Sequence, residues 1–129
     1  MNEQIRILVV EDDPELRETL QEFLMRKGYL VDVARDVTQA LSKLWTGRYD
    51  IAVTDIVMPG LSGLKLLSLS KGILDVVDFI VITGYDSPEN RREAIRLGAK
   101  SYFVKPFDLD QVLSSIQSIT SIRNSTDLS

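Results

Sequence analysis

The 129-residue chain contains no cysteine and no histidine. Without cysteine it can form neither disulfides nor thiolate metal sites. The absence of histidine excludes imidazole-based general base catalysis, Ser-His-Asp chemistry and imidazole metal ligation. Any metal ion must therefore bind through oxygen ligands, which favours Mg²⁺, Ca²⁺ or Mn²⁺.

Long apolar runs and an excess of positive charge are also missing. No stretch approaches the roughly 18 consecutive apolar residues that a membrane helix requires. The net charge is −4, so a nucleic acid is not the expected partner. The N-terminal residues include an acid and lead directly into a strand pattern, unlike a signal peptide. We therefore expect a cytoplasmic location, with direct binding to neither membrane nor nucleic acid.

What is present is an ordinary globular composition, with 44% hydrophobic and 26% charged residues. Five short apolar runs predict β-strands. Residues 5–10, 51–54 and 79–83 are nearly continuous in Val, Ile and Leu, which is typical of central parallel strands buried on both faces. Residues 30–34 alternate and residues 101–104 form a short run, so these two segments predict the edge strands.

Helical patterns lie between the strands. Residues that can begin a helix precede four of them: Asp13 with Pro14, Asp36, Ser87 with Pro88, and Asp108. The third helix contains Leu64 and Leu67 and is expected to stop near Gly72. The second helix is expected to bury one apolar face, made by Val37, Ala40, Leu41, Leu44 and Trp45. The fourth is expected to carry Ala94, Ile95 and Leu97 in the same way.

Strand and helix alternate five times, which predicts a parallel sheet with helices on both faces. Right-handed crossovers and five strands favour the flavodoxin-like α/β order 2-1-3-4-5, which places the two alternating or short strands at the edges. We expect one domain over residues 1–122, followed at 123–129 by a polar C-terminal tail or the start of a linker.

Polar residues follow the central strands, where each strand ends. They are Glu11, Asp12 and Asp13 after the first strand, Asp55 at the third, Thr83 at the fourth and Lys105 after the fifth. Because the carboxyl ends of parallel strands share one edge of the sheet, these side chains are expected to converge there.

This convergence predicts phosphoryl-transfer chemistry. Clustered carboxylates repel one another unless a cation neutralises them, and Mg²⁺ suits an all-oxygen site. Lys105 and Thr83 could contact a phosphoryl group, and Asp55 is a competent nucleophile that would form an aspartyl phosphate. Singly, Lys105 is more simply a surface lysine and Thr83 an ordinary strand residue; their joint placement at strand ends favours the chemical interpretation.

From about Ile5 to Ile119 the chain resembles the receiver domain of two-component response regulators, and four motifs carry the resemblance. They are I-L-V-V-E-D-D from residue 7, T-D-I-V-M-P-G-L-S-G from 54, V-I-T-G from 81 and G-A-K-S-Y-F-V-K-P-F from 98. Each motif alone is weak, but all four in this order and spacing are highly specific. The stretch 71–79 departs from the family pattern, because it lacks the proline usual before the fourth strand.

The resemblance implies roles for individual residues. Asp55 would be the phosphoacceptor, Asp12 a direct Mg²⁺ ligand and Glu11 a ligand that acts through water. Asp55 itself and the backbone carbonyl of Val57 would complete the protein's share of the metal shell, and Mn²⁺ could replace Mg²⁺.

The resemblance implies further roles for three residues of the fourth and fifth strand ends. Lys105 would contact the phosphoryl group and precede a cis proline bond. Thr83 and Tyr102 would form the switch pair that responds to phosphorylation.

As a member of this family, the chain would be a phosphorylation-activated switch. It would accept a phosphoryl group from the phosphohistidine of a sensor histidine kinase, or of a phosphotransfer protein, and would change the face made by the fourth helix, fifth strand and fifth helix. An output domain or downstream protein would read that face, and phosphorylation could drive homodimerisation. No turnover of an external substrate is expected beyond self-phosphorylation and self-dephosphorylation.

Two other interpretations remain. The first is a phosphorylation-independent docking module of the same fold, although such family members usually lose the acid pair, the aspartate or the lysine. The second is a phosphohydrolase with an Asp nucleophile. Enzymes of that kind need a second Asp two positions on, where this chain has Val57. Flavin binding is disfavoured, because the acids after the first strand would repel a phosphate.

Overall fold

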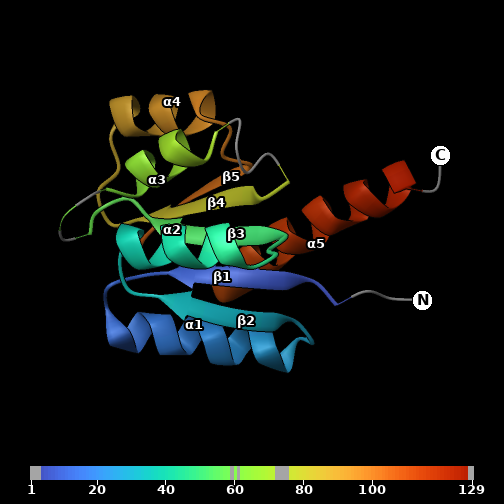
Figure 1. Ribbon diagram of the computed structural model, residues 1–129. Coiled ribbons are helices and arrows are strands. Elements are labelled where there is room, and N and C mark those ends of the chain that lie inside the picture. Colours follow the sequence, from blue (N-terminus) through green and yellow to red (C-terminus); the bar gives the residue numbers. More distant parts are fainter. Residues whose placement is uncertain (1–3, 59, 61, 72–75, 128–129) are drawn as a thin grey trace.

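The computed structural model describes residues 4–58, 60, 62–71 and 76–127, with side chains described as far as Ile122. Five strands and five helices alternate along it (Figure 1). The strands are β1 (Arg6–Val10), β2 (Leu30–Ala34), β3 (Ile51–Asp55), β4 (Asp78–Thr83) and β5 (Ser101–Val104). The helices are α1 (Pro14–Arg26), α2 (Val37–Thr46), α3 (Gly63–Ser70), α4 (Pro88–Arg96) and α5 (Leu109–Asp127).

The strands form one parallel sheet in the order β2-β1-β3-β4-β5, which confirms the predicted α/β topology. The near-continuous apolar strands β1, β3 and β4 lie in the centre, and β2 and β5 lie at the edges. Each observed strand begins and ends within one residue of its predicted limits. The register pairs Val10 of β1 with Thr54 of β3, and Asp55 with Ile82 of β4, so the ends of the central strands lie together.

Helices cover both faces of the sheet (Figure 1). Helices α2, α3 and α4 pack on one face, where buried side chains form one apolar cluster: Leu8, Val10, Ala52, Val81, Ala40, Leu44, Leu66, Leu67 and Ala94, among others. Helices α1 and α5 pack on the other face, over a second cluster that includes Ile7, Val9, Val53, Ile80, Leu20, Leu24, Val112 and Ile116. Because alternate residues of a strand point to opposite faces, each central strand supplies both clusters, which explains its continuous apolar sequence.

Capping side chains begin all five helices, and at the start of α5 the Asp108 carboxylate accepts a bond of 2.9 Å from the Asp110 N–H. The oxygens of Asp13, Asp36, Ser62 and Ser87 accept hydrogen bonds from backbone N–H groups in the first turn of α1, α2, α3 and α4. These N–H groups have no partner within a helix, so a side-chain oxygen stabilises each start by about 1 kcal/mol. The predicted capping role of Asp13 is thereby confirmed.

The predicted apolar faces of two helices are partly wrong. Trp45 of α2 is 71% exposed and Ile95 of α4 is 60% exposed, whereas their neighbours Leu44 and Ala94 are buried. Successive residues of a helix differ by roughly 100° around its axis, so a residue next to a buried one can leave the core face. The narrower stripe of Val37, Ala40 and Leu44 is what α2 buries.

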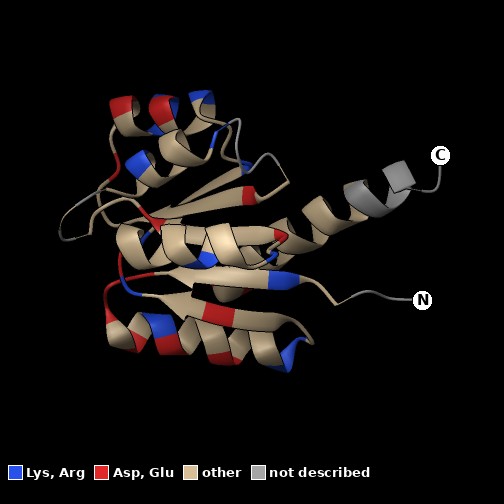
Figure 2. Ribbon diagram, viewed as in Figure 1, with Lys and Arg blue, Asp and Glu red and all other residues tan. Residues whose placement is uncertain are grey.

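The ends of α3 and α5 lie near two expected boundaries. Helix α3 ends at Ser70, and the expected stop at Gly72 lies outside the described residues. Helix α5 continues past residue 122 to Asp127, and the division into a domain and a tail at that position stays a prediction. Figure 2 shows that α5 carries few charges while α1 and α4 carry many, in keeping with the uncharged sequence from residue 111 to 122.

Side chains from the adjacent helices donate hydrogen bonds to carbonyls on the outer edge of β2. Val31 and Val33 point their carbonyls away from β1, because Leu30 and Ala34 make the backbone bonds to the β1 side. The Val31 carbonyl accepts a bond of 3.4 Å from Gln21, and the Val33 carbonyl accepts one of 2.6 Å from the Lys43 ammonium. The two outward carbonyls of the edge strand are therefore bonded within the chain.

None of the described helices combines the length and the apolar character that crossing a lipid bilayer would need.

Gly63, the first residue of α3, lies directly against the end of β3. Its N–H donates to the Ile56 carbonyl at 2.9 Å. A Cβ at this position would lie 1.9 Å from the Asp55 carbonyl oxygen, which is a backbone atom. The start of α3 is therefore held against the strand that carries Asp55 in a way that only glycine permits.

We expect Gly63→Ala to lower the free energy of unfolding by about 3 kcal/mol or more, because the added methyl group must displace backbone. Urea denaturation of both proteins measures the difference. Gly84→Ala is the control, since a Cβ there meets only the Lys105 side chain, at 3.7 Å. Equal losses in the two variants would contradict the close packing at Gly63.

Candidate functional site

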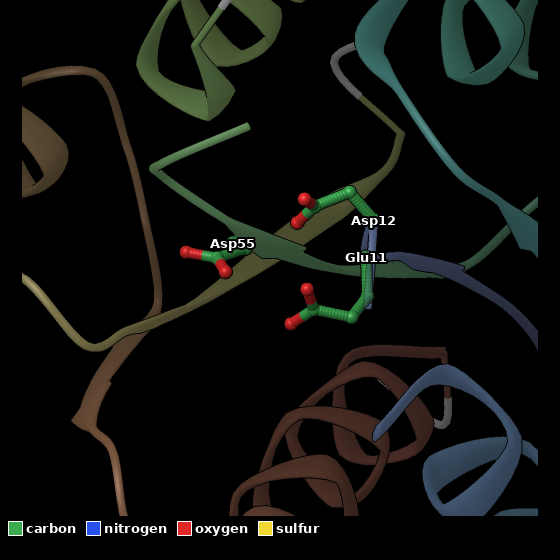
Figure 3. A group of neighbouring side chains, drawn as sticks. All are labelled: Glu11, Asp12 and Asp55. Atoms are coloured by element: carbon green, nitrogen blue, oxygen red, sulfur yellow. The ribbon is translucent and has the colours of Figure 1, made fainter. Parts of the chain in front are cut away.

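Three carboxylates meet at the carboxyl edge of the sheet (Figure 3). Glu11 and Asp12 follow β1, and Asp55 is the last residue of the neighbouring strand β3. One carboxylate oxygen from each of these residues lies within 4.8 Å of the others. Glu11 and Asp55 are buried, and Asp12 is exposed. The structure thus brings the predicted acids together, with an opening to solvent on the side of Asp12.

Lys105 is the cation that balances the two buried acids. Its ammonium donates to Glu11 Oε1 at 2.8 Å and to Asp55 Oδ2 at 2.7 Å. The Glu11 side chain is 1% exposed, that of Asp55 5% and that of Lys105 25%. With all groups ionised, three carboxylates face one ammonium, which leaves the cluster with a charge of −2.

Burial and the unbalanced charge change the pKa values of Glu11 and Lys105. Burial raises the pKa of Glu11 to about 7, with the Asp55 charge adding to the rise and the bond from Lys105 opposing it. Burial alone would lower the pKa of Lys105, but its bonds to Asp55 and Glu11 outweigh burial and raise it. The lysine therefore stays charged, while Glu11 gains a proton near neutral pH when no other cation is present.

Backbone groups hold the two buried carboxylates in place. The Val57 N–H donates to Asp55 Oδ1 at 3.1 Å, and the Asp13 N–H donates to Glu11 Oε2 at 3.1 Å. Each carboxylate thus uses one oxygen for the lysine and one for a backbone N–H, so its orientation is fixed. The metal-binding role of the Val57 carbonyl stays a prediction.

Thr83 of β4 lies beside this cluster, and Tyr102 lies on the next strand, β5. Thr83 is fully buried, its hydroxyl accepts a bond of 2.9 Å from the Tyr85 N–H, and its carbonyl accepts one of 2.7 Å from the Lys105 N–H. Tyr102 packs against the apolar cluster under α4, and the Arg91 guanidinium lies 4.7 Å from the centroid of its ring. Thr83 is therefore bonded to the residue that holds Asp55, and Tyr102 lies one strand further out. The switch role of this pair stays a prediction.

The donor set fits a hard divalent cation. Its ligand atoms are carboxylate oxygens, its charge with all groups ionised is −2, and one member is open to solvent, as a magnesium ion that keeps several waters requires. Asp12, Asp55 and, through water, Glu11 are the residues that would hold the ion. The Lys105-Pro106 bond is cis, as predicted.

Sequence reasoning missed Arg17 of α1, whose guanidinium bonds to the backbone carbonyls of Glu11 and Asp12. A signal was present in the sequence. A basic residue near the start of a helix opposes the helix dipole, so its presence there indicates a specific partner.

Comparison with known proteins supplies independent findings. The family model described as the response regulator receiver domain matches residues 7–117. The response regulator MprA of Mycobacterium tuberculosis (strain ATCC 25177 / H37Ra) is 36% identical over 115 residues, which cover 89% of this chain and 50% of that protein. The chain therefore spans about half the length of the curated relatives it matches.

Solved structures agree with this likeness. A CheY-like response regulator receiver domain protein from Methanospirillum hungatei JF-1 superposes with a TM-score of 0.90 at 27% identity, covering 95% of this chain and 99% of that one. The response regulator TrrA from Thermotoga maritima, solved in complex with Mg(2+)-BeF, gives a TM-score of 0.82 at 34% identity, covering 90% and 99%.

The raised pKa of Glu11 predicts a pH dependence of stability in metal-free buffer. A folded-state pKa of about 7 against an ordinary value of 4.5 means that the folded protein binds the extra proton. The stabilising contribution of Glu11 is thus full below pH 4.5 and is lost as the pH rises through about 7. Glu11→Gln lacks this loss. Between pH 4.5 and pH 8, its free energy of unfolding should therefore rise by about 1–3 kcal/mol relative to that of wild type.

Chemical denaturation at several pH values, with a chelator present, measures this difference. Glu18→Gln, an exposed position of α1, controls for the loss of one negative charge. A difference between Glu11→Gln and wild type that stays constant with pH would contradict the prediction.

Proposed function

Since the chain belongs to the response regulator receiver domain family, we propose that it is a phosphorylation-activated signalling switch with Asp55 as phosphoacceptor. The observation that carries the proposal is the Asp55 carboxylate bonded to Lys105, in a cluster with Glu11 and Asp12. A nucleophilic carboxylate, a fixed ammonium and an oxygen-only cation site together are what phosphoryl transfer to an aspartate requires.

In the proposed reaction, a carboxylate oxygen of Asp55 attacks the phosphorus of a phosphohistidine. The phosphorus–nitrogen bond breaks as the phosphorus–oxygen bond forms, and the donor histidine leaves with the bond's electron pair. The Val57 N–H, bonded to Asp55 Oδ1, orients the carboxylate during the attack. The later attack of water on the aspartyl phosphate releases inorganic phosphate and restores the aspartate.

Lys105 would change partners during this reaction. Its ammonium is now shared by Glu11 and Asp55, both acceptors within 2.8 Å. Once Asp55 is esterified, the phosphoryl group carries a charge of about −1.5 to −2 and offers stronger acceptors. Bonding to a phosphoryl oxygen would draw Lys105 toward the new group and leave Glu11 to the cation.

Asp12, Asp55 and the Val57 carbonyl would hold Mg²⁺ or Mn²⁺ directly, and Glu11 would act through water. The ion would neutralise charge on the phosphoryl oxygens as the group is transferred. The complex of TrrA with Mg(2+)-BeF supports this assignment by analogy, because that related receiver takes both a magnesium ion and a fluoride of beryllium.

The phosphoryl group would change the face formed by α4, β5 and α5 through Thr83 and Tyr102. The Thr83 hydroxyl, now bonded to the Tyr85 N–H, would turn to a phosphoryl oxygen, and Tyr102 would adjust against α4. A sensor histidine kinase or phosphotransfer protein is the proposed donor. An output domain or downstream protein would read the altered face, and a phosphorylation-dependent homodimer is one form that readout could take.

A docking module that works without phosphorylation is the alternative function. It would use the same face but would have no need of a buried acid pair. The structure favours the switch, because keeping Glu11 and Asp55 buried beside a single lysine costs stability that a docking surface alone does not require.

We expect acetyl phosphate with Mg²⁺ to add one phosphoryl group to the wild-type chain, because Asp55 needs only a small phosphodonor and the cation. Intact-protein mass spectrometry measures the adduct. It should be absent with a chelator and in Asp55→Asn. Asp50→Asn, another aspartate, is the control that should keep the adduct. A folded wild type with no adduct would overturn the switch and favour the docking module.

We expect Thr83→Ala to accept the phosphoryl group while losing the response of Tyr102, because the hydroxyl is the proposed link between the two. NMR spectra of the Tyr102 ring with and without beryllofluoride measure that response. Thr120→Ala, a partly exposed threonine of α5, is the control that should respond as wild type does. An unchanged response in Thr83→Ala would contradict the link.

A further inference from the structure

The acidic loop after β1 is bonded to one arginine. The Nη1 atom of Arg17 donates to the Glu11 carbonyl at 3.0 Å and to the Asp12 carbonyl at 3.4 Å. Arg17 lies in α1, and its own N–H donates to the Asp13 carbonyl at 2.9 Å. The side chain therefore returns from the helix to the loop that precedes it.

Other bonds secure the rest of this loop. The Glu11 N–H donates to the Ala34 carbonyl at 3.0 Å, and the Asp13 N–H donates to the Glu11 carboxylate at 3.1 Å. Arg17 supplies what these bonds leave open, namely a donor for two successive carbonyls. Without it, both carbonyls would depend on solvent, and the peptide between Glu11 and Asp12 would be free to rotate.

Asp12 is the residue that depends most on this arrangement. Glu11 and Asp55 are fixed by Lys105 and by backbone N–H groups. The Asp12 carboxylate is exposed, and among the described residues no hydrogen bond holds it. Its place beside the other two acids is therefore determined by the backbone of its own loop.

We propose that Arg17 is a positioning residue for the divalent-cation site. Its guanidinium fixes the Glu11 and Asp12 carbonyls and so holds the Asp12 carboxylate within reach of an ion bound to Asp55. The inference rests on the proposed function in one respect, that the acidic cluster takes a divalent cation.

Simple electrostatics predicts the opposite effect of removing Arg17, which makes the test decisive. A positive charge near the cluster repels a divalent cation, so its loss alone would tighten binding. Loss of positioning would weaken binding, as removal of a group that orients a metal ligand does. The sign of the change in affinity therefore separates the two roles.

The experiment measures Mn²⁺ binding to the full chain by EPR of the free ion, with Mg²⁺ as competitor. We expect Arg17→Gln to bind about tenfold more weakly than wild type. Arg26→Gln is the matched control, because it removes the same charge from the exposed far end of α1 and should bind as wild type does. Arg17→Lys keeps the charge without the guanidinium and should fall between the two.

The dependence of acetyl phosphate labelling on Mg²⁺ gives a second readout. In Arg17→Gln the Mg²⁺ concentration for half-maximal rate should rise about tenfold, while the rate at saturating Mg²⁺ stays near that of wild type. A positioning defect is overcome by excess ion, whereas damage to Asp55 or Lys105 is not. Circular dichroism confirms that each variant is folded, and Arg17→Lys carries the test if Arg17→Gln is not.

Affinity in Arg17→Gln equal to or tighter than that of Arg26→Gln would overturn the role of Arg17. So would an equally low rate at all Mg²⁺ concentrations. A wild type that binds neither Mn²⁺ nor Mg²⁺ would instead refute the cation site of the proposed function, so the two failures are distinguishable.

Discussion

Two buried carboxylates that share one ammonium are the constraint on which the rest of this molecule depends. Glu11 follows β1 and Asp55 ends the neighbouring strand β3, and among the described residues Lys105 is the cation paired with both. Burying like charges together is costly unless they are paired. The lysine that follows β5 therefore has to reach the acids at the ends of β1 and β3. The order of strands, with β4 between β3 and β5, provides that reach. With Asp12 included and all groups ionised, the cluster is one divalent cation short of neutrality, which is the property that the proposed switch needs.

Two contacts hold the surroundings of the cluster away from its open side at Asp12. Gly63 sets the start of α3 against the Asp55 backbone, and Arg17 ties α1 to the acidic loop. In the proposed switch, a change at Asp55 would reach β4 and β5 through Lys105, which is bonded to Asp55 by its side chain and to Thr83 through the backbone.

The fold and the site's membership could be predicted from sequence because both follow from local patterns. Continuous apolar runs indicate central strands, capping residues indicate helix starts, and the parallel order places every strand end at one edge. That is why Glu11, Asp12, Asp55 and Lys105 were expected together. The exposure of Trp45 and Ile95 was not predicted, because the width of a buried helix face depends on which neighbours cover it. Arg17 was missed because its only signal was a basic residue near the start of α1, and the pattern of side chains does not name its backbone partners.

The bonds to the outward carbonyls of β2 have a consequence when the chain is partly unfolded. Gln21 and Lys43 occupy the strand's outward carbonyls, and both side chains come from helices rather than from a neighbouring strand. The protection therefore lasts only while α1 and α2 remain docked. A chain that loses these helices but keeps its sheet would expose a bare edge, the usual template for cross-β assembly. Protection of these two carbonyls is thus a property of helix docking and not of the strand's own sequence.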